Sequence, residues 1–221
     1  MKKEIRDIVL PSQFLGDAKR YRTGPGTFVE NGRIYAKTLG IRYIKDNTIT
    51  VLPLKGSYQP RAGDIVVGIV EEVGTSMWLV DVNAVYPALL HVNEVPWHVE
   101  FGDTARYLNY GDVVLAKMLP SNEPDRLQIT LKDRTLHKIN GGTIIEIEPL
   151  KVPRVIGKKG SMIAALKKYT NCRIFVGKNG RIWVDGDTNA ILKVERAIRL
   201  IEREAHTYGL TDRVSAFLRE Q

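Results

Sequence analysis

The stretch that decides the fold of this chain is Val152-Pro153-Arg154-Val155-Ile156-Gly157-Lys158-Lys159-Gly160-Ser161-Met162-Ile163. Two glycines enclose two lysines, with apolar residues on both sides. Because glycine has no Cβ, the backbone at both glycines can come close to a ligand. Lys158 and Lys159, with Arg154 before them, offer cations to phosphates at the start of a helix. We predict a phosphate-binding loop; the alternative is a tight turn between two helices whose lysines are merely solvated.

The segments around this loop indicate a small α+β domain. A strand is expected over residues 142–147, an amphipathic helix directly after the loop, then strands over 172–176 and 181–184. A final helix is expected, with Asp187 or Thr188 as its cap. Its apolar positions have core spacing and are Ile191, Val194, Ile198 and Ile201. The order of segments and the Ile-Gly-x-x-Gly loop resemble a eukaryotic-type KH domain. That resemblance implies RNA binding by Arg154, Gly157, Lys158, Lys159 and Gly160.

A second glycine motif, Gly177-Lys178-Asn179-Gly180, lies between the two later strands. Asn-Gly favours a tight hairpin turn, because both residue types tolerate positive φ. We therefore predict a structural turn at Gly177, Asn179 and Gly180, and not a second RNA-binding loop.

The middle of the chain is expected to form a β-barrel. Its short apolar segments are separated by turns, as in a small closed or nearly closed barrel. These segments are residues 65–70, 77–82, 88–92, 112–118 and 126–131. Blocks such as Gly63-Asp64-Ile65-Val66 and Ala88-Leu89-Leu90-His91-Val92 follow one another as in the S1 RNA-binding domain, an OB-fold barrel, which this region resembles.

The expected RNA-binding face of the barrel departs from the S1 pattern. Such domains usually read Phe-Gly-Ala-Phe-Val where this chain has Ser76-Met77-Trp78-Leu79-Val80, so both stacking rings are lost, although His91 keeps its place. Trp78 does not replace them, because a one-residue offset turns a side chain to the opposite face of a strand. We expect weak RNA binding on this face and a larger contribution from exposed loops that include Arg106.

The first third of the chain is predicted to be a small β domain. Glycine and proline leave only strand-length segments there, and Asn31-Gly32 between residues 27–29 and 33–36 favours a hairpin. Residues 58–62 are expected to be a linker, because Pro60 cannot donate a backbone hydrogen bond to a sheet.

The charge distribution also divides the chain in three. The sequence has 221 residues, 43% hydrophobic and 26% charged, with a formal net charge of +8. The net charge is +7 up to residue 62, −6 over residues 63–137 and +7 over the remainder. We therefore predict a multidomain protein, mainly β plus α+β: an N-terminal β domain at 1–60, an S1 barrel at 61–137 and a KH domain at 138–221.

The composition argues against several other classes of protein. Charged residues near Met1 take the place of the apolar run of a secretory signal, and no stretch is long and apolar enough to span a membrane. A cytoplasmic location is expected. We expect neither a metal site nor a cofactor, because the chain has one cysteine and its histidines are scattered. These residues are Cys172, His91, His98, His137 and His206.

The complete pattern resembles the S1/KH cap subunit of the archaeal RNA exosome. The N-terminal segments Gly24-Pro25-Gly26-Thr27-Phe28-Val29 and Ile49-Thr50-Val51-Leu52-Pro53-Leu54 are similar to that family's first domain. In the family, the Gly-x-Asn-Gly turn is associated with packing of KH against S1. The related cap subunit without KH ends in a zinc ribbon, which a single cysteine excludes here.

The resemblance implies a non-catalytic subunit that binds RNA. Three copies, possibly mixed with the zinc-ribbon cap subunit, would dock on a ring of RNase-PH-like subunits and feed RNA into it for 3′-to-5′ degradation. The sequence shows no catalytic motif, which agrees with this. Two alternatives stay open at this point: a freestanding S1/KH factor in transcription or translation, and an RNA-processing enzyme with S1 and KH appended, for which little chain remains.

Overall fold

The computed structural model describes residues 7–54, 56–121, 123, 126–205, 207 and 209–220. His206, one of the histidines considered above, lies outside them. The chain forms two compact units, Met1–Gly56 and Ser57–Gln221. Among the described residues, no helix is long and apolar enough to cross a membrane.

The first unit is built from short strands in two small sheets. One sheet has the order β1-β6-β7-β3 and the other β2-β5-β4. The strands are β1 (Asp7–Val9), β2 (Phe14–Asp17), β3 (Arg22–Thr23), β4 (Thr27–Glu30), β5 (Arg33–Ala36), β6 (Gly40–Lys45) and β7 (Thr48–Pro53). Asn31 and Gly32 have φ of 49° and 75° in the turn between β4 and β5, so the hairpin is confirmed.

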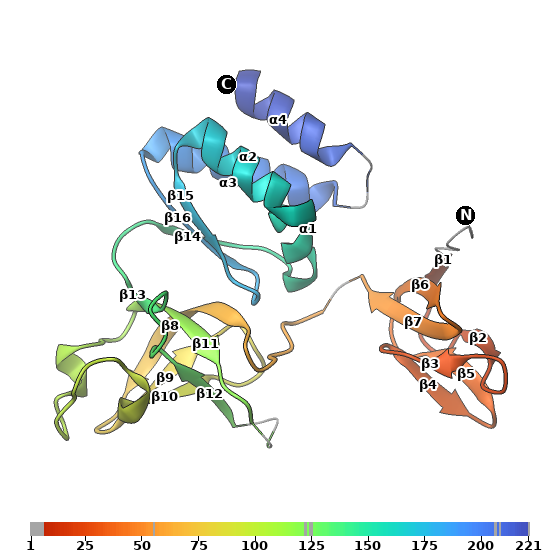
Figure 1. Ribbon diagram of the computed structural model, residues 1–221, viewed down its shortest axis with the longest axis horizontal. Coiled ribbons are helices and arrows are strands. Elements are labelled where there is room, and N and C mark those ends of the chain that lie inside the picture. The colour runs from red at the N-terminus through yellow and green to blue at the C-terminus, as the bar shows by residue number, and fades with distance from the viewer. Residues whose placement is uncertain are drawn as a thin grey trace. The chain divides into compact units, whose positions relative to one another are not determined.

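The second unit begins with a closed barrel of the OB type (Figure 1). Its strands are β8 (Ile65–Val73), β9 (Met77–Asp81), β10 (Ala88–His91), β11 (Val113–Met118) and β12 (Leu127–Thr130). The order β12-β10-β9-β8-β11 is closed by pairing of β12 with β11, which confirms the predicted barrel. A further strand, β13 (His137–Ile139), pairs with β11 and was not predicted.

Tyr58 belongs to the barrel, although its segment reads as a linker. The side chain is 5% exposed and packs in the barrel core, and its hydroxyl donates to Asp64 Oδ2 at 2.9 Å. Burial, together with this contact, raises the pKa of Tyr58 above the usual tyrosine range. Proline keeps residues 58–62 out of a sheet, but an aromatic ring still gains by leaving water.

The KH domain completes the second unit. Its three-stranded antiparallel sheet has the order β14-β16-β15, and helices cover the face of the sheet that points away from the barrel (Figure 1). The elements are β14 (Thr143–Glu146), α1 (Val152–Ile156), α2 (Ser161–Thr170), β15 (Arg173–Val176), β16 (Arg181–Asp185), α3 (Thr188–Arg203) and α4 (Leu210–Glu220). Asp187 caps α3, accepting from the backbone N–H of Asn189.

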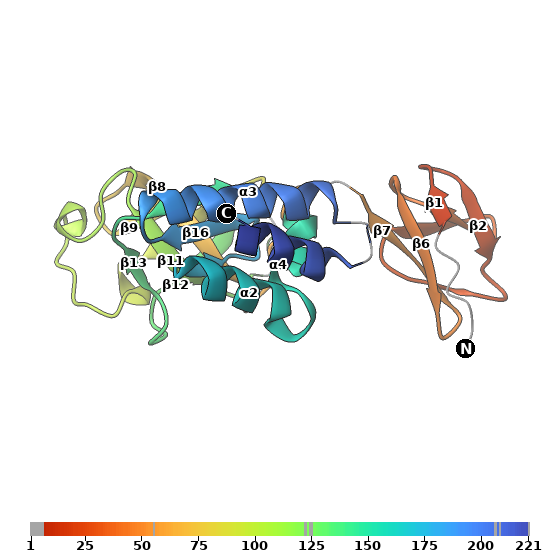
Figure 2. The same cartoon turned by 90° about the horizontal axis from the view of Figure 1, so that it is seen from above.

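Helix α4 was not predicted, although its sequence holds the signal. Leu210, Val214 and Leu218 recur every four residues and are buried. Figure 2 shows α4 between α2 and α3, so these side chains complete the helical layer of the KH core.

The two faces of the KH sheet pack against different cores. Ile145, Ile182 and Val184 face the helical core, whereas Ile144 and Trp183 pack against the barrel core. The barrel and the KH domain therefore share one continuous apolar contact.

Candidate nucleic-acid interface

The loop between α1 and α2 owes its shape to its first glycine. Gly157 has φ of 75°, and a Cβ there would lie 2.6 Å from the backbone nitrogen of Met162. Gly160 also has positive φ, at 80°, yet a Cβ there would contact only the Ile163 side chain, at 3.9 Å. Lys159 adopts a left-handed conformation, with φ of 52°. Close packing thus requires glycine at Gly157, while the backbone conformation favours it at Gly160.

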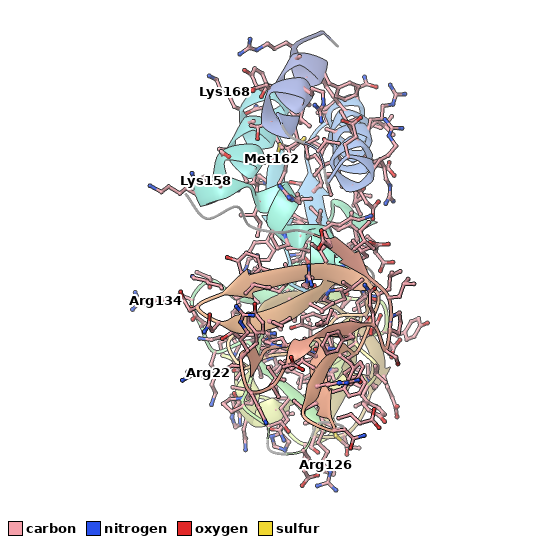
Figure 3. The ribbon with its side chains drawn as sticks, turned by 90° about the vertical axis from the view of Figure 1, so that its right-hand side faces the viewer. Arg22, Arg126, Arg134, Lys158, Met162 and Lys168 are labelled. Carbon is pink, nitrogen blue, oxygen red and sulfur yellow. The ribbon has the colours of Figure 1, made fainter. Side chains whose placement is uncertain are left out.

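The cations of this loop are free for a ligand. Arg154, Lys158 and Lys159 are exposed, and in the part of the chain that the structure describes none of them pairs with a carboxylate. Lys158 extends away from the domain in Figure 3. The arrangement can bind a chain of phosphates, because backbone and cations are both accessible on one edge of the domain.

The second glycine motif lies between β15 and β16 and contacts the barrel. Asn179 is 0% exposed; its Nδ2 donates to the carbonyls of Val67 and Val82, at 2.8 and 2.9 Å, and its Oδ1 accepts from Val67 N at 3.3 Å. The Lys178 backbone N–H donates to the Ile65 carbonyl at 2.9 Å. One buried amide thus satisfies backbone groups of β8 and of the residue that follows β9.

The glycines of this motif leave no room for side chains. Gly177 lies against Asn179, and a Cβ at Gly180, where φ is 85°, would collide with the carbonyl oxygen of Ile147. The two glycine motifs therefore differ in surroundings: the first is an exposed loop and the second is buried between domains.

Arg181 makes a contact between the barrel and the KH domain that was not predicted from the sequence. Its side chain is 6% exposed, ion-pairs with the carboxylate of Asp81, and donates from Nη1 to the Asp81 carbonyl at 2.7 Å and from Nε to Glu146 Oε1 at 2.8 Å. Within the sequence, only the position next to the Asn-Gly turn could have drawn attention to it. The arginine ties β9 of the barrel to the KH sheet.

The usual S1 face is poorly equipped for stacking bases. Trp78 is 0% exposed inside the barrel and donates to the Leu108 carbonyl at 3.0 Å, which confirms that it faces inward. Met77, 40% exposed, stands on the outer face. His91 lies at the end of β10, and its Nδ1 accepts from the backbone N–H of Asn93 at 3.1 Å.

A shallow hollow adjoins His91 on this face. Its volume is about 260 Å³, and its polar lining could accept or donate hydrogen bonds to one base. The lining residues are Leu89, His91, Asn93, Glu94, Gln128 and Ile129. Arg106 does not line this hollow; its side chain is exposed and pairs with Asp103 at 2.8 Å.

In comparisons with known proteins, three family models match this chain. Residues 6–55 match the "Exosome RNA binding protein RRP4 N-terminal domain", residues 57–118 the "RRP4, S1 domain" and residues 142–190 the "KH domain". A protein from Methanosarcina mazei named "Exosome complex component Rrp4" is 44% identical over 98% of this chain and 83% of its own length. The chain belongs to the Rrp4 family.

Further comparisons agree with this family. A protein of the same name from Picrophilus torridus is 44% identical over 97% of this chain and 93% of its own. A crystal structure of an exosome complex RNA-binding protein covers 75% of this chain and 97% of that chain, with a TM-score of 0.69 and 38% identity. The predicted exosome family and its N-terminal, S1 and KH composition are thereby confirmed. S1 and KH domains are non-catalytic, so the chain is an RNA-binding component and not an enzyme.

Proposed function

We propose that this protein binds RNA substrate at the cap of an exosome and feeds it into an RNase-PH-like ring for 3′-to-5′ degradation. The observation that supports the proposal is the exposed loop with Lys158 and Lys159, whose cations have no carboxylate partner among the described residues. Phosphate contacts of this kind position a strand without selecting its sequence. The role would suit a subunit that accepts many different RNAs.

The test is RNA binding by the Lys158→Ala/Lys159→Ala variant across a salt series. Removal of two phosphate contacts should weaken binding and reduce the salt slope by about 1.4 units, at about 0.7 for each phosphate on a single strand. Thermal stability should stay the same, because both side chains are exposed.

Lys178→Ala is the matched control. It removes an exposed lysine from the second glycine motif, where only the backbone N–H contacts the barrel. The control should bind RNA as the unmodified chain does. Equal binding by the double variant and the control would refute the assignment of the first loop to RNA.

We further propose that the N-terminal domain, at 1–60, docks on the ring, with S1 at 61–137 and KH at 138–221 handling RNA. The division of the chain after Gly56 and the net charge of +7 up to residue 62 support this. An apolar row crosses one sheet of this domain: Ile8 opposes Ile41, and Ile41 opposes Leu52. Ile8 is 67% and Leu52 54% exposed, which suits a protein partner.

Docking can be tested with charged substitutions in this row. Ile8→Asp/Leu52→Asp should abolish co-purification with ring subunits, because a carboxylate would be buried without a partner. Val29→Asp, at a position 50% exposed in the other sheet, is the control. Undiminished ring binding by the first variant would contradict docking through this row. A freestanding factor would bring down no ring subunits at all.

The remaining features of the assembly are proposals by analogy with the family. They are three copies on each ring, mixed caps with the zinc-ribbon subunit, and a cytoplasmic location. The archaeal origin of relatives named as exosome components supports the last of these. His91 and Arg106 are proposed as secondary RNA contacts.

A further inference from the structure

The few cations of the acidic barrel region are mostly neutralised by nearby carboxylates. Lys132 and Arg134 are the exceptions: both are exposed, and within the described ranges neither pairs with an acidic side chain. Both belong to one short loop, residues 131–136, between β12 and β13. The neutralised pairs are Arg106–Asp103, Lys117–Asp133 and Arg126–Glu123, at 2.8, 3.9 and 3.0 Å.

This loop is held firmly by the barrel. Leu131 and Leu136, at its two ends, are 0% and 4% exposed in the barrel core. Leu131 N donates to the Glu94 carbonyl at 2.7 Å, and Leu136 N donates to the Asp133 carbonyl at 3.0 Å. Lys132 and Arg134 are therefore presented to solvent from a fixed backbone.

The KH domain has exposed cations at both ends of α2. Lys158 precedes the helix, and Lys167 and Lys168 lie in its last turn, exposed and without carboxylate partners in the described part of the chain. A ten-residue helix is about 15 Å long. Lysines in a last helical turn also interact favourably with the helix dipole, which is the structural alternative for Lys167 and Lys168.

These free cations lie on one side of the second unit. In Figure 3, Arg134, Lys158 and Lys168 all project toward the same side, whereas Arg126 projects from the lower end of the barrel. Figure 2 agrees, since α2 and the segment before β13 lie along the same edge of this unit. The buried contacts of Asn179 and Arg181 hold the barrel against the KH domain.

We propose that one RNA strand binds across this side and touches both domains. Lys132 and Arg134 of the barrel would contact phosphates of the strand that the KH loop holds, and Lys168 would contact them from α2. The proposal rests on the RNA-binding function proposed above and extends it from one loop to a surface. The ligand is the phosphate backbone of single-stranded RNA, because the surface offers cations and few exposed rings.

The fixed spacing of the two domains gives this surface a property that a single loop lacks. Once the KH loop has bound, the barrel cations meet the same strand at a high effective concentration. A KH loop accommodates about four nucleotides, so short RNA reaches that loop alone. Longer RNA should bind more tightly, and the gain should depend on Arg134 and Lys168.

The experiment measures binding of the full chain to oligouridines of about four and about sixteen nucleotides at several salt concentrations. Arg134→Ala/Lys168→Ala should bind the long RNA about five- to tenfold more weakly, with a salt slope lower by about 1.4 units, and the short RNA as before. Arg126→Ala is the control, because Arg126 is also an exposed barrel arginine, but it has a carboxylate partner and lies on a different side. It should match the unmodified chain with both RNAs.

Two results would overturn the proposal, and they are distinguishable. In the first, Arg134→Ala/Lys168→Ala binds long RNA like the unmodified chain, while Lys158→Ala/Lys159→Ala binds it weakly. RNA would then contact only the KH loop, and the proposed surface across both domains would be wrong. If neither variant changes binding, the proposed function of the loop fails as well. A loss from Arg126→Ala as large as that from Arg134→Ala/Lys168→Ala would show a general charge effect, which also contradicts a specific surface. Thermal melts of every variant establish that each one is folded.

Discussion

At the scale of single residues, the two glycine motifs should respond differently to a side chain. Gly160 and Gly180 both have positive φ, but only at Gly180 would a Cβ collide with the backbone, at the Ile147 carbonyl. Gly180→Val should therefore cost about 3 kcal/mol of unfolding free energy, from strain and the collision together. Gly160→Ala should cost about 1 kcal/mol, from strain alone. Denaturant titrations of both variants test this, and equal losses would contradict the buried position of the second motif.

At the scale of elements, β13 gains stability from a carboxylate in the turn before β11. Partial burial opposes ionisation of Asp112, but the Asn109 N–H at 2.7 Å and the Lys138 ammonium prevail and lower its pKa. A lowered folded pKa gives stability that is present above the unfolded value of about 3.9 and is lost as pH falls through the folded pKa. Asp112→Asn should thus cost about 1 kcal/mol at pH 7.

Measurements at acidic pH test this contribution of Asp112. The stabilities of the unmodified chain and of Asp112→Asn should approach each other as pH falls below the unfolded value of about 3.9 and through the lowered folded pKa. Urea titrations at pH 7 and pH 3 measure the difference. If the difference in unfolding free energy persists unchanged at pH 3, the stabilising contact of Lys138 does not depend on the charge of Asp112.

At the scale of the whole molecule, two independent unfolding transitions are expected. The hydrophobic core of the first unit consists of residues within the range 9–51. In the second unit, the KH sheet packs against the barrel core. Deletion of residues 1–56 should therefore leave the melting temperature of residues 57–221 unchanged in calorimetry. Asn179→Ala should lower that temperature, because buried carbonyls of Val67 and Val82 lose their donor. Separate melting of barrel and KH domain in the unmodified chain would contradict this coupling.

The sequence by itself determined the local elements and the order of the domains. Asn31-Gly32 predicts its hairpin because the turn depends on two residues that tolerate positive φ. The apolar spacing of Val194, Ile198 and Ile201 predicts the buried face of α3 in the same way. Such features depend on a few neighbouring residues, so the pattern along the chain is enough. The exposed glycine loop could be located for the same reason.

The tertiary structure alone decided how these elements meet. β12 pairs in parallel with β10, Ala88 opposite Leu127, and its pairing with β11 closes the barrel. Trp183, on the outer face of the KH sheet, packs against the barrel core. The apolar run in β16 is typical of a strand buried on both faces, but periodicity does not say what covers each face. Likewise, Asp133 is next to Arg134 in the sequence, but folding pairs this carboxylate with Lys117 at 3.9 Å and leaves Arg134 without a carboxylate partner among the described residues. Contacts between residues distant in the chain depend on the complete fold, and so does the distribution of free charge that an RNA strand would meet.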